Sequence, residues 1–149
     1  MKTLTICNSA RLFPQVLELK KELEKLGFIV LIHEASVTMH GKEVPVEQYN
    51  VIKKGEWNDE LQKTLAPKMR DHFEKIEKLD AIVVMNKDKE GRKNYIGGNT
   101  LIEMGLAFYL QKQIFLTNPI PTDVPYVEEI RGVSPIILTK LEDIKEYLK

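Results

Sequence analysis

Short apolar runs alternate along this chain with stretches of helical periodicity, and this alternation limits the possible folds more than any other feature. The apolar runs occupy residues 3–7, 28–33, 80–86, 113–118 and 135–138. Between the first two runs, apolar side chains recur at helical steps of three and four, at Val16, Leu19, Leu23 and Leu26. Strands that alternate with helices through right-handed crossovers predict an α/β fold. We expect a doubly wound, flavodoxin-like parallel sheet of about five strands with helices on both faces.

The helices are expected at residues 12–26, 59–79, 100–112 and 141–148, with a short helical piece after the proline-rich segment 118–126. Pro67 lies inside the second helix and is expected to kink or divide it. Residues 34–58 show no clear period, so we predict an irregular insertion that acts as a functional loop, a lid or a flexible segment. The whole chain, 1–149, is predicted to form one domain.

The composition excludes several classes of protein. With 43% hydrophobic and 30% charged residues, the chain has the balance of a folded globular domain. Its 22 basic and 22 acidic residues cancel, so no overall field attracts nucleic acid or an anionic membrane. Cys7 is the single cysteine, and no Cys/His spacing suggests a zinc site. No run is as long as a signal peptide's apolar region or a membrane span. We therefore expect a cytoplasmic protein with no metal, no other cofactor, and no nucleic-acid or membrane partner.

Polar residues follow the predicted strands at the edge where doubly wound sheets bind ligands. Asn8 and Ser9 follow the first strand, and Asn86 and Asn118 follow the strands at 80–86 and 113–118. Three asparagines favour recognition of a ligand by neutral hydrogen bonds, and we predict that all four residues contact it. For Ser9, a plain helix cap is an equally good interpretation.

The segment GGNTLIEMGLA (97–107) has two interpretations. Thr100 and Glu103 have the spacing of a capping box, in which hydroxyl and carboxylate each accept a hydrogen bond from a backbone N–H. Alternatively, Glu103 is a partly desolvated carboxylate at the mouth of a cleft, because the helix that carries it is apolar almost all round. Gly97, Gly98 and Asn99 would then let a ligand approach the backbone closely. The segment matches neither a Walker loop nor GxGxxG.

Three stretches together resemble the nucleoside 2-deoxyribosyltransferase-like superfamily: DAIVVMN (80–86), GGNTLIEMGLA (97–107) and KQIFL (112–116). In that family the glutamate of a Glu-x-Gly-x-Ala helix is the nucleophile that attacks the anomeric carbon of a nucleoside or nucleotide. The resemblance implies that Glu103 has this role here. It also implies a glycosidase-type covalent step, in which the carboxylate traps the sugar while the base leaves with a proton.

The chain departs from the family pattern at the residues that would supply that proton. Eight residues before Asp80, where the family commonly has an aspartate, stands His72. The turn before the helix, where many members have another aspartate, contains Gly97, Gly98 and Asn99. His72 can act as the acid because an imidazole exchanges protons near neutral pH, although a histidine that merely packs on its helix is the alternative. The departures leave a second function open, a catalytically inactive module that binds a nucleotide or nucleoside.

The resemblance implies a small-molecule nucleoside or nucleotide as partner and a homo-oligomeric assembly, for which residues 34–58 and 118–126 are the expected contacts. In the insertion, His40, Tyr49 and Trp57 either stack on a base or pack a satellite cluster or subunit interface. Arg11 and the cationic segment 87–93 either contact a phosphate or lie in solvent. Cys7 is expected to be buried and unreactive.

Overall fold

The sheet at the centre of the molecule has five strands in the order β2-β1-β5-β6-β7. The computed structural model describes residues 1–8, 12–33 and 36–149. Every neighbouring pair in the sheet is parallel, and the strands are β1 (Thr3–Cys7), β2 (Ile29–Leu31), β5 (Ala81–Val84), β6 (Gln113–Leu116) and β7 (Ile136–Ile137). Numbered within the sheet, the order is the flavodoxin-like 2-1-3-4-5, so the predicted fold class is confirmed.

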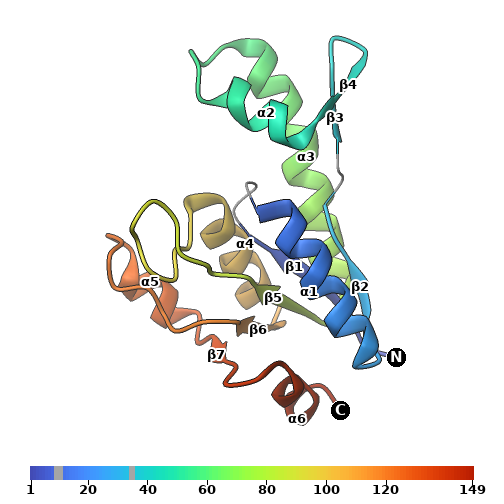
Figure 1. The fold of residues 1–149 in the computed structure, drawn as a ribbon, viewed down its shortest axis with the longest axis vertical. Helices are drawn as coiled ribbons and strands as arrows, with labels where there is room; N and C mark the ends of the chain where they lie inside the picture. The colour runs from blue at the N-terminus through green and yellow to red at the C-terminus, as the bar shows by residue number, and fades with distance from the viewer. Residues whose placement is uncertain (9–11, 34–35) are drawn as a thin grey trace.

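Helices cover both faces of this sheet (Figure 1). Their bounds are α1 (Phe13–Lys25), α3 (Asp59–Lys78), α4 (Gly98–Tyr109), α5 (Val127–Gly132) and α6 (Ile144–Tyr147), the last preceded by a 3-10 turn (Leu141–Asp143). Side chains of α1 and α6 share one buried cluster with the sheet, and those of α3, α4 and α5 share another. No helix in the described part of the chain is both long and apolar enough to cross a membrane.

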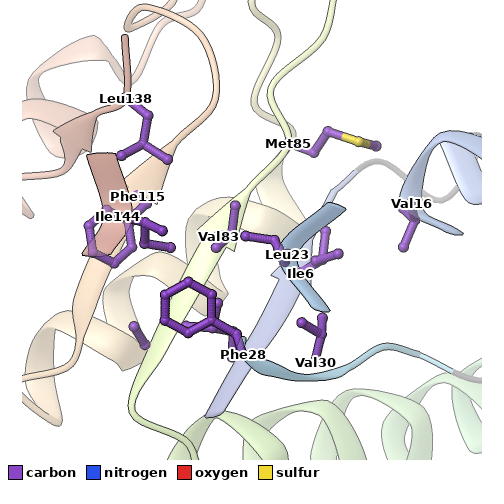
Figure 2. Packing of buried hydrophobic residues seen from close by; sticks show 12 residues of the cluster. Ile6, Val16, Leu23, Phe28, Val30, Val83, Met85, Phe115, Leu138 and Ile144 are labelled. Atoms are coloured by element: carbon purple, nitrogen blue, oxygen red, sulfur yellow. The ribbon is translucent and has the colours of Figure 1, made fainter. Parts of the chain in front are cut away.

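Alternation along β5 divides its side chains between the two clusters. Successive strand residues point to opposite faces, so Val83 packs with α1 and α6 while Ile82 and Val84 pack with α3 and α4. Figure 2 shows the first cluster, in which Val83 lies among Phe28, Phe115 and other apolar side chains. Both faces are apolar because both are covered, which explains the almost unbroken apolar runs in the sequence.

Asp80 joins the start of β5 to the start of β1. Its Oδ2 accepts hydrogen bonds from the backbone N–H of Thr3 at 2.7 Å and from the Thr3 hydroxyl at 2.8 Å. These bonds hold the pKa of the Asp80 carboxyl below its usual range, because they favour the charged form. The contact therefore helps to set the register in which Leu4 lies opposite Ala81.

Residues 36–53 form regular secondary structure, so the prediction of an irregular insertion is wrong for them, and a role as a functional loop or lid stays a prediction. They form an antiparallel hairpin of β3 (Ser36–Met39) and β4 (Lys42–Pro45), followed by α2 (Val46–Lys53). His40 and Gly41 both have positive φ, which is the two-residue turn that suits the twist of a hairpin. A hairpin this short with one exposed face has too few apolar positions to show a period, and for that reason the sequence pattern missed it.

The hairpin and α2 stand beyond the edge of the sheet, at the top of Figure 1, and the first part of α3 runs beside them. A separate buried cluster holds them together and contains Val37, Met39, Tyr49 and Leu61. Helix α3 begins at Asn58, whose side chain accepts a hydrogen bond from the backbone N–H of Leu61 at 2.9 Å. It continues through Pro67 without division, so one helix connects this cluster to the core of the sheet.

Candidate active site

A cavity of about 750 Å³ lies where the carboxyl end of β1 meets the hairpin, α2, α3 and the start of α4. This is the edge at which doubly wound sheets bind ligands. Predicted site residues Asn8, His72 and Glu103 line it, as does the glycine-rich turn described below. The volume is in the range of small-molecule binding sites.

Glu103 and His72 form a buried hydrogen-bonded pair in the wall of this cavity. The His72 Nδ1 and Glu103 Oε1 atoms are 2.7 Å apart, and the two residues are 9% and 6% exposed. His72 comes from α3 and Glu103 from α4, two helices that pack side by side on the same face of the sheet. A carboxylate this buried needs a partner, and an imidazole N–H is a strong one. The sequence placed both residues in the site but did not predict their direct contact.

The capping-box interpretation of Glu103 is wrong, because α4 begins earlier than expected. Its N-cap is Gly97, whose carbonyl accepts a hydrogen bond from the N–H of Leu101 at 3.0 Å, and no side chain caps the helix. Thr100 is therefore inside the first turn and buried. Glu103 lies beyond that turn and bonds to another helix instead of to its own backbone.

Cys7 completes the surroundings of the Glu103 carboxylate. It is fully buried at the end of β1, as predicted, and hydrogen-bonds to Glu103. Burial, followed by the negative charge of Glu103 and this hydrogen bond, raises the pKa of the Cys7 thiol well above its ordinary value. The thiol is therefore a neutral donor. The Cys7, His72 and Glu103 ligand atoms all lie within 4.8 Å of one another, a spacing that also suits a metal ion and that no sequence motif indicated.

The glycine-rich turn provides an open part of the cavity wall. Gly97, Gly98 and Asn99 all line the cavity. A Cβ atom at Gly97 would meet the Tyr95 ring at 3.5 Å, an ordinary contact, and one at Gly98 would meet no protein atom within 4 Å. Packing inside the protein thus does not require glycine at position 98. The bare backbone leaves space for something outside the chain.

Asn86 and Asn118 do not line this cavity. Instead they bond to each other across the ends of β5 and β6. The Asn86 side chain donates to the carbonyls of Asn118 and Pro119, at 3.0 and 2.9 Å, and accepts from the N–H of Asn118 at 3.0 Å. Asn118 lines a different hollow beside α1. Ser9, the other predicted contact, lies outside the described residues.

Two aromatic candidates of the insertion, His40 and Trp57, are exposed side chains outside the cavity lining. Tyr49 is fully buried in the satellite cluster, in agreement with the packing interpretation. Its ring supports two lysines that the sequence analysis missed. Lys53 Nζ lies 4.9 Å and Lys68 Nζ 5.1 Å from the ring centroid, and both side chains line the cavity.

No family model and no curated protein matches this chain by sequence. Solved structures do match its fold. A 2-deoxyribosyltransferase from the psychrotolerant bacterium Bacillus psychrosaccharolyticus has a TM-score of 0.59 at 13% identity, over 97% of this chain and 91% of that chain. A CMP N-glycosidase from Clostridium botulinum has a TM-score of 0.45 at 15% identity, over 99% of this chain and 98% of that chain. The first of these likenesses shows that the chain has the fold of that 2-deoxyribosyltransferase over nearly its whole length.

Proposed function

We propose that the protein cleaves or transfers the N-glycosidic bond of a nucleoside or nucleotide, with Glu103 as the nucleophile. The observation that carries the proposal is the buried Glu103–His72 pair, 2.7 Å apart in the wall of a cavity at the ligand-binding edge of the sheet. A solved structure with this fold is a 2-deoxyribosyltransferase, which supports N-glycosidic chemistry in general.

The chemistry proceeds in two steps. Glu103 attacks the anomeric carbon, so that a C–O bond forms while the C–N bond breaks and its electron pair leaves with the base. Protonated His72 gives the departing base its proton. Neutral His72 then takes a proton from water, or from the hydroxyl or N–H of an acceptor, whose oxygen or nitrogen displaces Glu103 from the sugar. Both residues return to their starting protonation states.

The neighbours of Glu103 suit this role. His72 and the neutral Cys7 thiol both hydrogen-bond to the carboxylate and hold its oxygens in place. Attack converts the Glu103 carboxylate into an uncharged ester. The hydrogen bond from His72 to Glu103 then weakens, which frees the His72 proton for the departing base. A fixed carboxylate close to the anomeric carbon also lowers the entropic part of the barrier.

The test is to incubate the protein with a panel of nucleosides and nucleotides and to measure release of free base by chromatography. We expect release from at least one substrate, and a loss of about 1,000-fold or more in Glu103→Ala. Undiminished release by Glu103→Ala would rule out this mechanism.

A binding module without catalysis is the second candidate. It is favoured by His72 standing where the family commonly has an aspartate, and by the two hydrogen bonds that already satisfy Glu103. Such a protein would bind a panel member tightly and release no base from it under any condition. The same incubation, combined with calorimetric titration, separates the two functions.

We further propose that the protein acts as a homo-oligomer, with α4 as a contact. This helix exposes Ile102, Phe108 and Tyr109, which are 51%, 52% and 83% exposed, and Tyr109 borders an apolar hollow between α3 and α4. Apolar side chains gathered on one surface favour association with a second copy. Light scattering should show an oligomer that Tyr109→Glu dissociates, whereas Leu17→Glu, at an exposed apolar position of α1 on the other face of the sheet, should leave it intact. Residues 34–58 and 118–126 remain predicted contacts.

A further inference from the structure

Five lysines line the cavity that contains Glu103, and three of them lie against aromatic rings: Lys53 from α2, Lys68 from α3 and Lys89 from the segment between β5 and α4. Lys53 and Lys68 both lie against the Tyr49 ring, at 4.9 and 5.1 Å from its centroid. Lys89 lies 5.1 Å from the centroid of the Tyr95 ring, and Tyr95 also lines the cavity. Aromatic rings thus hold the three cations in position rather than leaving them to move in solvent.

These cations form no ion pair with any carboxylate whose side chain the structure describes, which leaves out Glu34 and Glu47. The carboxylates of the lining have other partners: Asp71 pairs with Lys75 at 2.9 Å, Glu103 pairs with His72, and Glu60 lies 3.8 Å from His40 Nδ1. The surplus of positive charge is therefore directed at whatever enters the cavity.

The lysines also repel one another. Burial and then the charge of Lys53 lower the pKa of Lys68 to about 8. Burial and then the charge of Lys89 lower the pKa of Lys53. Like charges held together in a half-buried place are unfavourable without a counter-ion, and an anion between them would relieve the repulsion. A dianionic group with several oxygens matches several ammonium groups better than a single carboxylate does.

The position of this cluster relative to the reacting residues indicates which anion fits. Lys68 and His72 are one turn apart on α3, so their backbones are about 6 Å apart along the helix axis. Lys68 is close enough to Glu103 for the glutamate charge to act on its pKa. In a nucleoside 5′-phosphate, one ribose separates the phosphate from the glycosidic bond. When the anomeric carbon faces Glu103, the 5′ end of the sugar is thus within reach of the lysines.

We propose that the cavity takes a nucleoside 5′-monophosphate, whose phosphate is bound by Lys53, Lys68 and Lys89. The orientation of the ligand rests on the function proposed above, whereas the anion site rests on the lysines themselves. The segment 87–93, for which contact with phosphate was one of two interpretations, then contributes Lys89 to substrate binding.

Calorimetric titration with matched ligands tests the proposal. The full chain carrying Glu103→Gln, so that no substrate is consumed, is titrated with nucleosides and their 5′-monophosphates for each of the common bases. We expect a 5′-monophosphate to bind about 100-fold more tightly than its nucleoside, because charge-assisted hydrogen bonds are the strong ones. Wild-type protein titrated with the same nucleotide at low temperature checks that the glutamine variant is representative.

Matched variants assign the effect to these lysines. Lys53→Gln and Lys68→Gln should each weaken 5′-monophosphate binding about tenfold or more and leave nucleoside binding unchanged. Lys68→Arg, which retains the charge, should keep most of the affinity. Lys21→Gln is the control, because Lys21 is an exposed lysine of α1 outside the cavity lining and its replacement changes the net charge equally.

Equal affinity for nucleoside and 5′-monophosphate, or no binding of either, would overturn the proposal. So would equal losses of nucleotide affinity in Lys21→Gln and Lys68→Gln. Inorganic phosphate that binds as tightly as the nucleotide would overturn it as well. Failure of the reaction gives a different pattern. If 5′-monophosphates bind through the lysines and no base is released, the phosphate site stands and the proposed reaction falls. If nucleosides and nucleotides are cleaved equally well and cleavage depends on Glu103, the reaction stands and the phosphate site falls.

Discussion

Two carboxylates lie near opposite ends of β5, and their surroundings differ in kind. Asp80, at the amino end, is held by the backbone N–H and hydroxyl of Thr3. Glu103, beyond the carboxyl end and on α4, is held by the imidazole of His72 and the thiol of Cys7. The partners of Asp80 cannot exchange protons near neutral pH, whereas an imidazole can. The same functional group therefore fixes strand register at one end of the sheet and is available for chemistry at the other.

Isosteric amide substitutions at the two carboxylates should separate these roles most sharply. Glu103→Gln is expected to reduce base release by about 1,000-fold or more, because an amide is a far weaker nucleophile. Asp80→Asn should retain near-normal kcat in the molecules that remain folded. Measuring kcat alongside the far-ultraviolet circular dichroism of each variant checks the comparison. Equal losses of kcat in both would show that the contrast between the two ends is false.

Removing the proton-exchanging partner of Glu103 should have the next largest effect. His72→Gln keeps a hydrogen-bond donor near Glu103 but cannot shuttle protons, so kcat should fall by about 100-fold or more. The slope of kcat against pH near neutrality should flatten as well, which a purely structural role would not produce. His40→Gln is the matched control, since His40 is exposed on the hairpin and outside the cavity lining. A pH profile unchanged by His72→Gln would contradict the assigned role.

Binding of a 5′-monophosphate by Lys53, Lys68 and Lys89 should weaken as the pH rises above neutrality. The pKa of Lys68 is lowered to about 8, and the groups that act on it are Lys53 and Glu103, beside the Tyr49 ring. Raising the pH from 7 to 9.5 neutralises this ammonium, so affinity for a 5′-monophosphate should fall by about tenfold. Titration calorimetry at the two pH values measures the change. In Lys68→Arg the loss should become smaller, because arginine stays charged, and the remainder should come from Lys53, whose pKa is also lowered.

At the amino end of β5 the smallest effect is expected, and it concerns stability alone. Asp80→Asn should lower the free energy of unfolding by about 1 kcal/mol, a modest value because the site is partly exposed. The folded-state pKa of Asp80 is depressed, so its contribution is present above the unfolded-state pKa, about 3.9, and is lost as pH falls through the folded value. Urea titrations at pH 7 and pH 3 should therefore show a gap between wild type and Asp80→Asn that narrows at the lower pH.

Local patterns in the sequence were sufficient for the fold. Apolar steps such as Val16 to Leu23 identified α1, and the apolar run around Val83 identified β5. Right-handed crossovers then left few topologies, and the predicted one is observed. The sequence pattern did not predict the β3–β4 hairpin because its strands are short. In the structure, its turn is marked by the positive φ of His40 and Gly41.

The sequence predicted only those residues of the candidate site that belong to a recognisable motif. Glu103 and His72 were identified through the resemblance, but their contact depends on how α3 packs against α4. Lys53 and Lys68 come together only because Tyr49 lies between α2 and α3, a tertiary arrangement that no spacing along the chain records. Asn86 and Asn118 were expected to contact the ligand, yet neighbouring strands bring them to each other.

The hairpin and α2 come from one uninterrupted stretch that leaves the sheet after β2 and returns to it through α3. The hairpin and α2 contribute Lys53 and the Tyr49 ring on which Lys53 and Lys68 rest, whereas Lys68 and His72 lie on α3 and Glu103 on α4. Under the proposed function, part of the ligand site therefore lies in a segment of the gene that does not encode the reacting pair. If the proposed reaction holds, exchanging residues 36–58 between relatives would change one wall of the ligand site and leave Glu103 and His72 in place.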